Sequence, residues 1–348
     1  NNMDYINYVK QSPMSMSGFG GPVGALNFNG ASGAPFVTGG ARGTFGGGNP
    51  DELPGPGSKN DDGGYKVIDY VSIDTTGNAS DFGRLTIKTF QAAACSNQTR
   101  AVWMGGGTVG GPTLTDVMQY VTIASTGDAA DFGNTLSIVK SEAGCSDGSA
   151  GNRGIYWPGQ YQQAGTSNDQ IGYINISSTG NAQDFGNTLQ NTRTGCAWAD
   201  STRGCFNGVN ASTGSASNVI EYITIQSTGN STDFGDMVSA SEKRAGTADA
   251  TRGVISNGEG SGGSMNQIDY VAIQTLGNAS NFGSSTITTN GRGGCSNGTR
   301  GVFAGGEVPS PQTGYNVIDY ITIQTTGNAS DFGDLIIGRR QLPAGAAG

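Results

Sequence analysis

Side chains that could do chemistry recur at regular places along this chain of 348 residues. An arginine occurs at six such places: Arg42, Arg100, Arg153, Arg203, Arg252 and Arg300. A second position is acidic in five copies, Asp81, Asp131, Asp184, Asp233 and Asp331, and is Asn281 in the sixth. We expect the arginines to donate to carboxylates or backbone carbonyls and so to tie strands together. The alternative is a ring of cations that lines a pore or a ligand site.

The cysteines could bind a metal or form disulfides, but their spacing favours neither. Four of them precede successive arginines at what we interpret as one repeat position: Cys95, Cys145, Cys196 and Cys295. Val37 and Thr247 fill that position elsewhere. Equivalent positions in different repeats should exceed the Cα separation of ~7 Å that a disulfide allows, so we expect buried, reduced thiols, Cys205 included. Because the chain has no CxxC pair and no histidine, we predict no metal site and no cofactor.

Calcium is the remaining metal to consider. Turns such as residues 76–81 carry Asn, Ser and Asp oxygens of the kind that bind calcium. These turns lack densely alternating carboxylates, and Asx turns account for the same residues without an ion. We therefore predict no calcium site.

The lack of histidine also limits catalysis. Ser-His and Cys-His nucleophiles cannot form, and the sequence contains no GxSxG motif or phosphate-binding loop. Two carboxylates brought together by the fold could still cleave a glycan, but no pair is marked out by its position. We predict that the protein is not an enzyme, with a glycan-active enzyme as the third candidate function.

These residues belong to a sequence motif that occurs six times in the chain. Its phenylalanine falls at Phe82, Phe132, Phe185, Phe234, Phe282 and Phe332, in steps of 50, 53, 49, 48 and 50 residues. A tyrosine stands twelve residues before each of them, from Tyr70 to Tyr320. β-Branched and aromatic runs separated by Gly- and Asn-rich turns predict four short strands per copy, in the chain order b, c, d and a. We expect the repeated Tyr and Phe rings to be buried.

The period predicts the fold. A repeat of about fifty residues is typical of kelch-type blades, in which a small antiparallel sheet buries its faces against its neighbours. We predict an all-β, kelch-type β-propeller with six blades, in which the segment after residue 339 completes the first blade beside residues 42–48. In the seven-bladed alternative, the two termini share an incomplete blade.

Composition excludes two classes of partner. A net charge of -9 with only 18 lysines and arginines argues against nucleic acid, because phosphate contacts need clustered cations. No apolar run approaches the ~20 residues that cross a bilayer, so we predict no membrane insertion.

The segments between strands b and c differ most from copy to copy. The first, residues 49–66, contains Asp61, Asp62 and Tyr65. Other aromatic residues in or beside these segments are Trp157, Tyr161 and Tyr315. Variable loops on a rigid scaffold are typical of a binding surface, and exposed aromatics can stack on sugars or anchor a protein. The alternative is that these loops vary because nothing constrains them.

Residues 1–34 depart from the repeat, which leaves residues 35–348 for the propeller. Tyr5, Ile6, Tyr8 and Phe19 give this segment a large apolar content, while its glycines and prolines disfavour a helix. We expect it to become ordered by burying these side chains, either against a partner protein as an anchor or within the ring as a half-blade.

The repeats also resemble a known family. Residues 299–306 (TRGVFAGG), 316–323 (NVIDYITI) and 326–333 (TGNASDFG) are similar to kelch-like repeats of virion structural proteins from phages that infect marine cyanobacteria. The resemblance covers about residues 36–348. Residues 5–13 (YINYVKQSP), followed by GFGG at 18–21, resemble a leader found on such proteins ahead of unrelated distal domains. The family repeats have no defined catalytic residues, so the resemblance assigns none here.

The resemblance implies a structural and adhesive protein of the phage virion, in a tail, a fibre or the capsid surface. The N-terminal segment would contact other virion proteins, and many copies of the propeller would bind host-surface glycan or protein multivalently. The rival function is a secreted or cell-surface lectin-like propeller of a bacterium.

Overall fold

The computed structural model describes residues 42–50, 66–108, 114–140, 143–148, 151–161, 168–309, 312–340 and 344–347. These residues form 26 β-strands and no helix, which confirms the all-β prediction. The predicted N-terminal segment, residues 1–34, lies outside them.

The strands follow the predicted order in six units, and we name each strand by its place from the centre outward as a, b, c or d. Unit 1 contains β26 (Ala344–Ala347), β1 (Arg42–Gly46), β3 (Val67–Ser72) and β4 (Ser80–Arg84). Unit 2 contains β5 (Ala93–Ser96), β6 (Arg100–Met104), β7 (Thr115–Thr122) and β8 (Ala130–Lys140). Unit 3 contains β9 (Ala143–Ser146), β10 (Arg153–Trp157), β12 (Asn168–Asn175) and the first part of β13 (Gln183–Ala199).

The remaining units repeat this order. Unit 4 contains the end of β13, then β14 (Arg203–Asn210), β15 (Ser217–Thr224) and β16 (Thr232–Ser241). Unit 5 contains β17 (Ala245–Ala248), β18 (Arg252–Gly260), β19 (Gly263–Ala272) and β20 (Ser280–Thr289). Unit 6 contains β21 (Gly293–Ser296), β22 (Arg300–Ala304), β24 (Gln312–Thr322) and β25 (Ser330–Arg340). Three short strands lie between b and c: β2 (Asn49–Pro50), β11 (Gln160–Tyr161) and β23 (Glu307–Pro309).

The units do not all form separate sheets. Within the described residues, the strands assemble into five sheets, and one of them has seven strands because β13 continues without a break from strand d of unit 3 into strand a of unit 4. Its pairing shifts register between Arg193 and Cys196. The expectation of one small sheet per repeat is therefore wrong for units 3 and 4.

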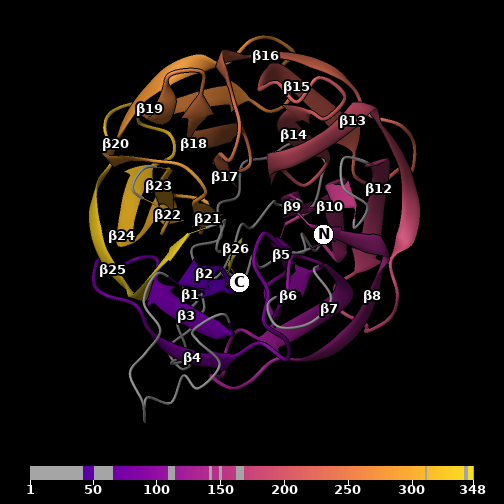
Figure 1. Cartoon of the computed structure of the whole chain (residues 1–348), viewed down its shortest axis with the longest axis vertical. Coiled ribbons are helices and arrows are strands. Elements are labelled where there is room, and N and C mark those ends of the chain that lie inside the picture. Colours follow the sequence, from indigo (N-terminus) through magenta and orange to yellow (C-terminus); the bar gives the residue numbers. More distant parts are fainter. Residues whose placement is uncertain are drawn as a thin grey trace, which may run out of the picture.

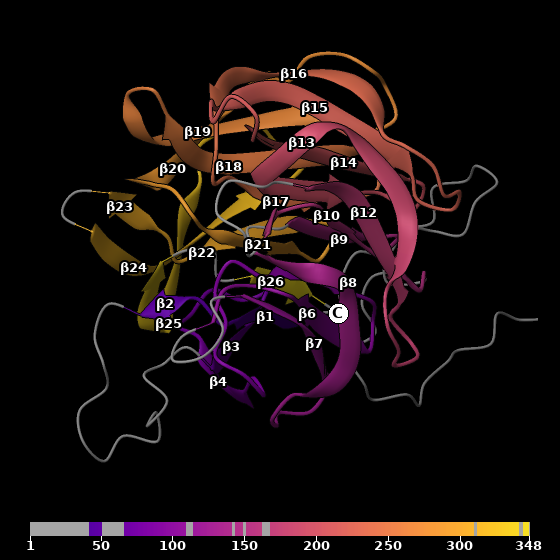
Figure 2. The same ribbon diagram turned by 45° about the vertical axis from the view of Figure 1, so that its right-hand side comes forward.

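The two ends of the described chain meet in unit 1. β26 pairs antiparallel with β1, with Gly43 opposite Ala347 and Gly46 opposite Ala344. In both ribbon views the sheets lie around a common centre, and β26 lies beside β1 (Figures 1 and 2). This pairing is the one predicted for a six-bladed arrangement.

The hydrophobic core is divided among the boundaries between units. Each of six clusters joins residues of two neighbours; the cluster between units 6 and 1, for example, contains Phe45, Ile73, Val302 and Phe332. All six repeated phenylalanines are buried, as predicted. The repeated tyrosines are only half-buried, and each packs edge-on against its phenylalanine with ring centroids 5.8–6.1 Å apart. Because no unit can bury its faces alone, the units stabilise one another.

The glycine that follows each repeated phenylalanine permits close contact between units. Gly83 has φ +153°, and a Cβ there would lie 2.2 Å from the carbonyl oxygen of Gly127 in unit 2. The backbone N–H of Gly127 donates to the carbonyl of Phe82 at 2.8 Å. A side chain at position 83 would separate these two segments, which explains the repeated Phe-Gly pair.

The five cysteines are buried free thiols, as expected, but one was placed wrongly in the repeat. Cys95, Cys145 and Cys295 pair with the third residue of strand b, whereas Trp198 occupies this place in unit 4. Cys196 lies two residues earlier in the same register and pairs with Asn207. Burial raises the pKa of the Cys295 thiol to about 12.

Candidate functional site

The six repeated arginines join neighbouring units, as predicted. Each donates from Nη1 to the carbonyl that follows strand c of the next unit: Arg42 to Ile123, Arg100 to Ile176, Arg153 to Ile225, Arg203 to Ile273, Arg252 to Ile323 and Arg300 to Ile73. Each guanidinium also covers the repeated tyrosine of its own unit, with Cζ 4.3–4.7 Å from the ring centroid. The arginines bond to carbonyls rather than to the repeated aspartates, so we assign them to the scaffold.

A second contact between units places a buried acceptor against the fourth residue after each repeated phenylalanine. The N–H groups of residues 86, 136, 189, 238, 286 and 336 are accepted in turn by Gln119, Tyr156, Glu221, Asp269, Asp319 and Asp69. In unit 3 strand c carries Gly172 at this place, and the Tyr156 side chain occupies the vacated space. Different side chains thus satisfy one backbone donor.

Three of these acceptors form buried ion pairs. Asp319 lies 2.6 Å from Nη1 of Arg292, Asp69 lies 2.9 Å from Nη2 of Arg339, and Asp269 lies 3.3 Å from Nη1 of Arg244. Burial raises the pKa of Asp69 although the charge of Arg339 opposes this rise. Glu221 lacks such a cation, and burial raises its pKa against the hydrogen bonds from Ser231 and Leu189. These acids are structural, because their oxygens face the neighbouring unit.

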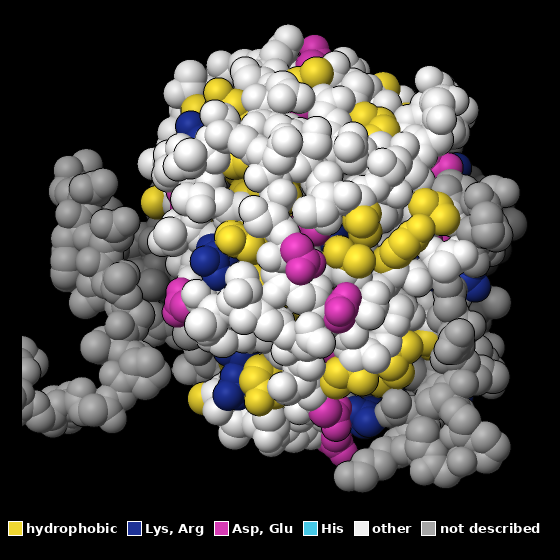
Figure 3. Space-filling model, turned by 90° about the vertical axis from the view of Figure 1, so that its left-hand side faces the viewer, with side chains coloured by type: hydrophobic (Ala, Val, Ile, Leu, Met, Phe, Trp, Pro, Cys, Tyr) yellow, Lys and Arg dark blue, Asp and Glu magenta, His cyan; other side chains and the backbone are white. Residues whose placement is uncertain are grey.

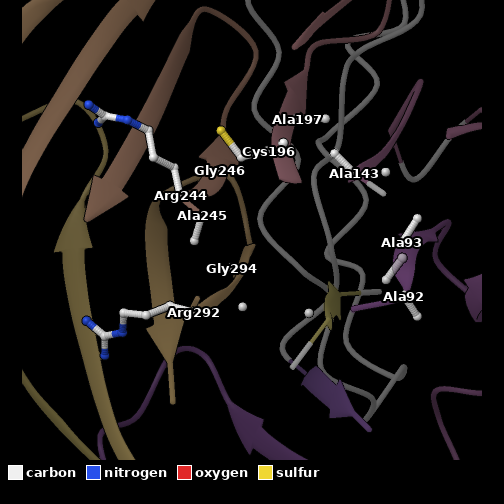
Figure 4. Close-up of a pocket in the computed structure, with 15 residues that line it drawn as sticks. Ala92, Ala93, Ala143, Cys196, Ala197, Arg244, Ala245, Gly246, Arg292 and Gly294 are labelled. Atoms are coloured by element: carbon white, nitrogen blue, oxygen red, sulfur yellow. The ribbon is translucent and has the colours of Figure 1, made fainter. Parts of the chain in front are cut away.

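The central cavity offers little chemistry. Its volume is about 60 Å³, and its lining consists mainly of alanines and glycines from the inner strands. Arg244 and Arg292 contribute to the lining, but their guanidinium groups point away from the cavity (Figure 4). They point instead toward Asp269 and Asp319. The inner strands approach closely, since a Cβ on Gly246 would lie 2.3 Å from the carbonyl oxygen of Ala197.

The units differ most in a set of six residue pairs that we call the divergent ring. In each pair, a residue in the last part of strand b or just after it forms backbone contacts with a residue near or beyond the end of strand d in the preceding unit. The pairs are Asn49 with Arg340, Gly107 with Phe90, Gln160 with Lys140, Asn210 with Thr192, Glu259 with Glu242, and Glu307 with Asn290. The backbone pairing is constant while the side chains vary, as on many recognition surfaces. Thr192, Asn290 and Glu307 are buried, so a ligand could reach only the partly exposed members, which include Glu242 and Glu259.

The best-defined part of the divergent ring surrounds Lys243. Its Nζ lies 2.6 Å from Oε2 of Glu259, and the same oxygen accepts from Nδ2 of Asn290 at 3.3 Å. Burial alone would lower the pKa of Lys243, but the hydrogen bond and charge of Glu259, with the charges of Glu242 and Glu307, raise it overall. The lysine therefore stays protonated and acts as a hydrogen-bond donor, not as a nucleophile.

Lys243 also adopts a strained backbone conformation. Its φ is +56°, and Gln91 and Thr194 occupy the equivalent turn with φ values of +54° and +53°. Gly291 fills the same position between units 5 and 6 with φ +67°. A left-handed conformation is unfavourable for residues with a Cβ, and such strain is frequently found at binding sites.

The predicted binding residues have mixed outcomes. Trp157 is wrong as a ligand contact, because its ring is fully buried and stacks on Phe206 with centroids 5.0 Å apart. Tyr315 is half-buried, and the backbone of Tyr161 pairs with Val139 in unit 2. Residues 61, 62 and 65 lie outside the described residues, as do Tyr5, Ile6, Tyr8 and Phe19. Among the predicted aromatic residues whose side chains the structure describes, Tyr315 is partly accessible and Trp157 is not.

Sequence reasoning missed Lys243, Glu259 and Asn290. Lys243 and Asn290 are 16 and 31 residues from Glu259 along the chain, and no motif links the three residues. The signal that could have found them is departure from the repeat: Glu259 and Glu307 each stand seven residues after a repeated arginine, at positions that are uncharged in the first four units.

On the side that shows β20, β24 and β25, charged side chains are few, and hydrophobic side chains form groups among the backbone and the other side chains (Figure 3). The large exposed hydrophobic residues are distributed one to each of units 2 to 6: Ile138, Leu189, Val238, Leu276 and Ile336. In the described residues no three acidic or cysteine side chains form a group that could hold a metal ion. Over the same residues, no helix is long and apolar enough to cross a membrane.

No family model matches the chain, and no curated protein is significantly similar to it in sequence.

Proposed function

We propose that the six units form a closed six-bladed β-propeller that acts as a structural and adhesive component of a phage particle. Three sets of contacts support closure, because each runs through all six units and returns to the first. The Arg300 bond to Ile73 joins unit 6 to unit 1, just as the Arg42 bond to Ile123 joins unit 1 to unit 2. The N–H of Gly77 donates to Phe332 across the same boundary.

The inner strands support the same proposal. β5, β9, β13, β17, β21 and β26 contact one another in this order, and β26 contacts β5. A cyclic arrangement brings the inner edges of the sheets together at the centre and leaves only the outer strands as edges at which other chains could associate. It also makes a rigid body whose surface can be presented repeatedly on a particle.

One observation carries the functional proposal: most of the side chains that could react or bind a ligand form contacts within the scaffold instead. The repeated arginines bond to carbonyls, the buried acids accept from backbone N–H groups, and the thiols are buried. What differs between units is the divergent ring, which combines cationic, acidic, amide and aromatic side chains. Such a surface suits weak polar recognition of a glycan or protein, strengthened by many copies.

The virion assignment rests on the sequence resemblance and is tested by location. Antibodies raised against the recombinant chain should label phage particles that are purified on a density gradient from a lysed culture in which the gene for this chain is present. The label should follow nuclease-protected phage DNA through the gradient. If it follows bacterial envelope or secreted fractions, the rival lectin-like propeller is the better assignment.

Adhesion is tested separately. Recombinant chain linked into streptavidin tetramers should bind host cells, and single chains should bind far more weakly. Lys243→Ala and Glu259→Ala should reduce this binding, while Lys88→Ala, a half-exposed lysine in unit 1, serves as the matched control. Equal binding by all three variants would remove the divergent ring as the recognition surface.

The anchoring proposal has its own test. A chain that begins at residue 35 should melt cooperatively but fail to enter particles if residues 1–34 are an anchor. Loss of the cooperative transition would assign that segment to the ring instead.

A further inference from the structure

A hydrogen bond between two side chains crosses most of the boundaries between units. The two partners differ from boundary to boundary, but a donor always faces an acceptor. One partner lies in the turn between strands a and b, and the other follows strand c of the next unit. Where the turn residue is an acid, its partner is a glutamine: Asp147 with Gln226, Asp200 with Gln274, and Asp249 with Gln324. Acceptor and donor therefore face each other at these three boundaries.

At the boundary between units 6 and 1 the roles are reversed. Asn297 occupies the turn, and its Nδ2 donates to Oδ1 of Asp74 at 2.7 Å. Its Oδ1 accepts from the N–H groups of Thr299 and Arg300, as Asp200 does from Thr202 and Arg203. The turn thus works with either an amide or an acid, but the bridge to Asp74 requires the amide.

This bridge lies at the boundary where the first and last units meet. Strands β1, β3 and β4 of unit 1 connect to unit 6 only through noncovalent contacts, because strand a of unit 1 comes from the other end of the chain. The Asn297 to Asp74 bond is one of these contacts, with the Arg300 bond to Ile73 beside it.

Asn297 is also followed by Gly298, which has φ +82°. Glycine has no Cβ to shield its backbone nitrogen, so this nitrogen can attack the Cγ atom of a preceding asparagine. Four other asparagines precede glycines. Asn207 and Asn290 are 2% and 0% exposed, whereas Asn29 and the side chain of Asn257 lie outside the described part of the chain. Asn297 is partly exposed in a turn, and Asn97 at the equivalent place in unit 2 precedes Gln98.

We propose that Asn297 is a site of spontaneous deamidation and that its conversion weakens the contact between units 6 and 1. The nitrogen of Gly298 attacks Cγ of Asn297, a C–N bond forms, and the side-chain amide leaves as ammonia. Water then opens the resulting succinimide to give aspartate or isoaspartate. Neither product can donate to Asp74, so two carboxylates face each other where an amide and a carboxylate stood.

The modification is tested by incubating the full chain at mildly alkaline pH and following each asparagine by peptide mass spectrometry. The acid form should accumulate at Asn297 several times faster than at Asn97, which shares its turn but lacks the glycine and is buried, and faster than at the exposed Asn328, which precedes Ala329. It should also outpace Asn207 and Asn290, which have the glycine but are buried. Equal rates at all these positions, or no conversion at Asn297, would overturn the assignment.

The consequence is tested with variants that fold with the turn intact. Asn297→Asp should lower the melting temperature, and the loss should shrink at high salt because the two charges are exposed. Adding Asp74→Gln should restore stability, since the pair then matches Asp200 with Gln274. If Asn297→Asp melts like the parent chain, or if Asp74→Gln restores nothing, the bridge does not hold this boundary together.

Discussion

One position in strand c tests whether a buried acid between units needs a cation beside it. Asp319 and Glu221 occupy this position in units 6 and 4, and both accept a backbone N–H from the neighbouring unit. They differ in their partners, because Asp319 contacts the fully buried Arg292 at 2.6 Å whereas Glu221 has no cation. Replacing each acid by its amide should therefore change stability in opposite directions.

Asp319→Asn should destabilise strongly. The variant retains an acceptor for Thr286 but leaves the Arg292 guanidinium buried without a counter-charge, which typically costs about 3–5 kcal/mol. In a protein of this size, such a loss should lower the melting temperature by roughly 5–10 °C. A double variant, Arg292→Met with Asp319→Leu, should recover most of it, because it removes both buried charges.

Glu221→Gln should be neutral or stabilising, by up to about 2 kcal/mol, because it removes a buried charge that has no opposite charge beside it. Burial raises the pKa of Glu221 above its ordinary value of 4.5, so the folded parent chain holds its proton more tightly than the unfolded chain does. The stabilisation due to that proton is complete below pH 4.5 and is lost as the pH rises through the raised native pKa. The advantage of the Gln variant should grow over this window and then level off.

The assay is chemical denaturation of the parent chain and the three variants at several pH values, with equal slopes as the check that only stability has changed. If Glu221→Gln costs as much as Asp319→Asn, the hydrogen-bond geometry of the acid matters and its charge does not. A neutral Asp319→Asn variant would equally refute the reasoning.

Other substitutions test the backbone and the core. Gln91→Gly should stabilise by about 1 kcal/mol in a melting experiment because the residue has φ +54°, whereas Gly291→Ala should destabilise by a similar amount; a loss on Gln91→Gly would show that strain there is offset by side-chain contacts. Gly133→Ala should cost more than about 2 kcal/mol, since its Cβ would lie 2.4 Å from the Gly180 carbonyl oxygen, and an unchanged melting curve would argue against that contact. Phe332→Ala should cost about 3–5 kcal/mol by leaving a cavity in the core between units 6 and 1, and a small melting shift would count against its packing. The Cys295 thiol should react with a thiol reagent only on unfolding, because burial raises its pKa to about 12; rapid labelling of the native chain would contradict this.

Much of the architecture could be predicted because each repeat is specified by residues that lie close together in the sequence. The twelve-residue spacing from Tyr320 to Phe332 specifies two strands and the turn between them, and the structure pairs them with Asp319 opposite Asp331. The repeated arginine was assigned to the scaffold from its recurrence alone. Its acceptor, the Ile73 carbonyl for Arg300, could not be predicted, because it lies 227 residues away and belongs to another unit.

The errors arose where one unit departs from the shared pattern. The sequence pattern aligns Cys196 with Cys145, but Trp198 takes this place, five residues before Arg203. Trp157 lies beside a variable loop, which predicts a ligand contact, yet in the fold its ring stacks on Phe206 of the next unit. A side chain near a loop is exposed or buried according to its neighbour in space, and sequence does not specify that neighbour.

The repeat, the strand order within it, the buried phenylalanines and the joining role of the arginines can be predicted from the amino-acid sequence, because they depend on local periodicity that recurs in every unit. Which of the unrepeated residues meet depends on the fold. Lys243, Glu259 and Asn290 come from successive turns of the repeat and converge around one carboxylate oxygen. Asn297 meets Asp74 because the end of the chain returns to its beginning. Contacts of this kind depend on how the units pack around the centre, and that packing is a property of all six units together.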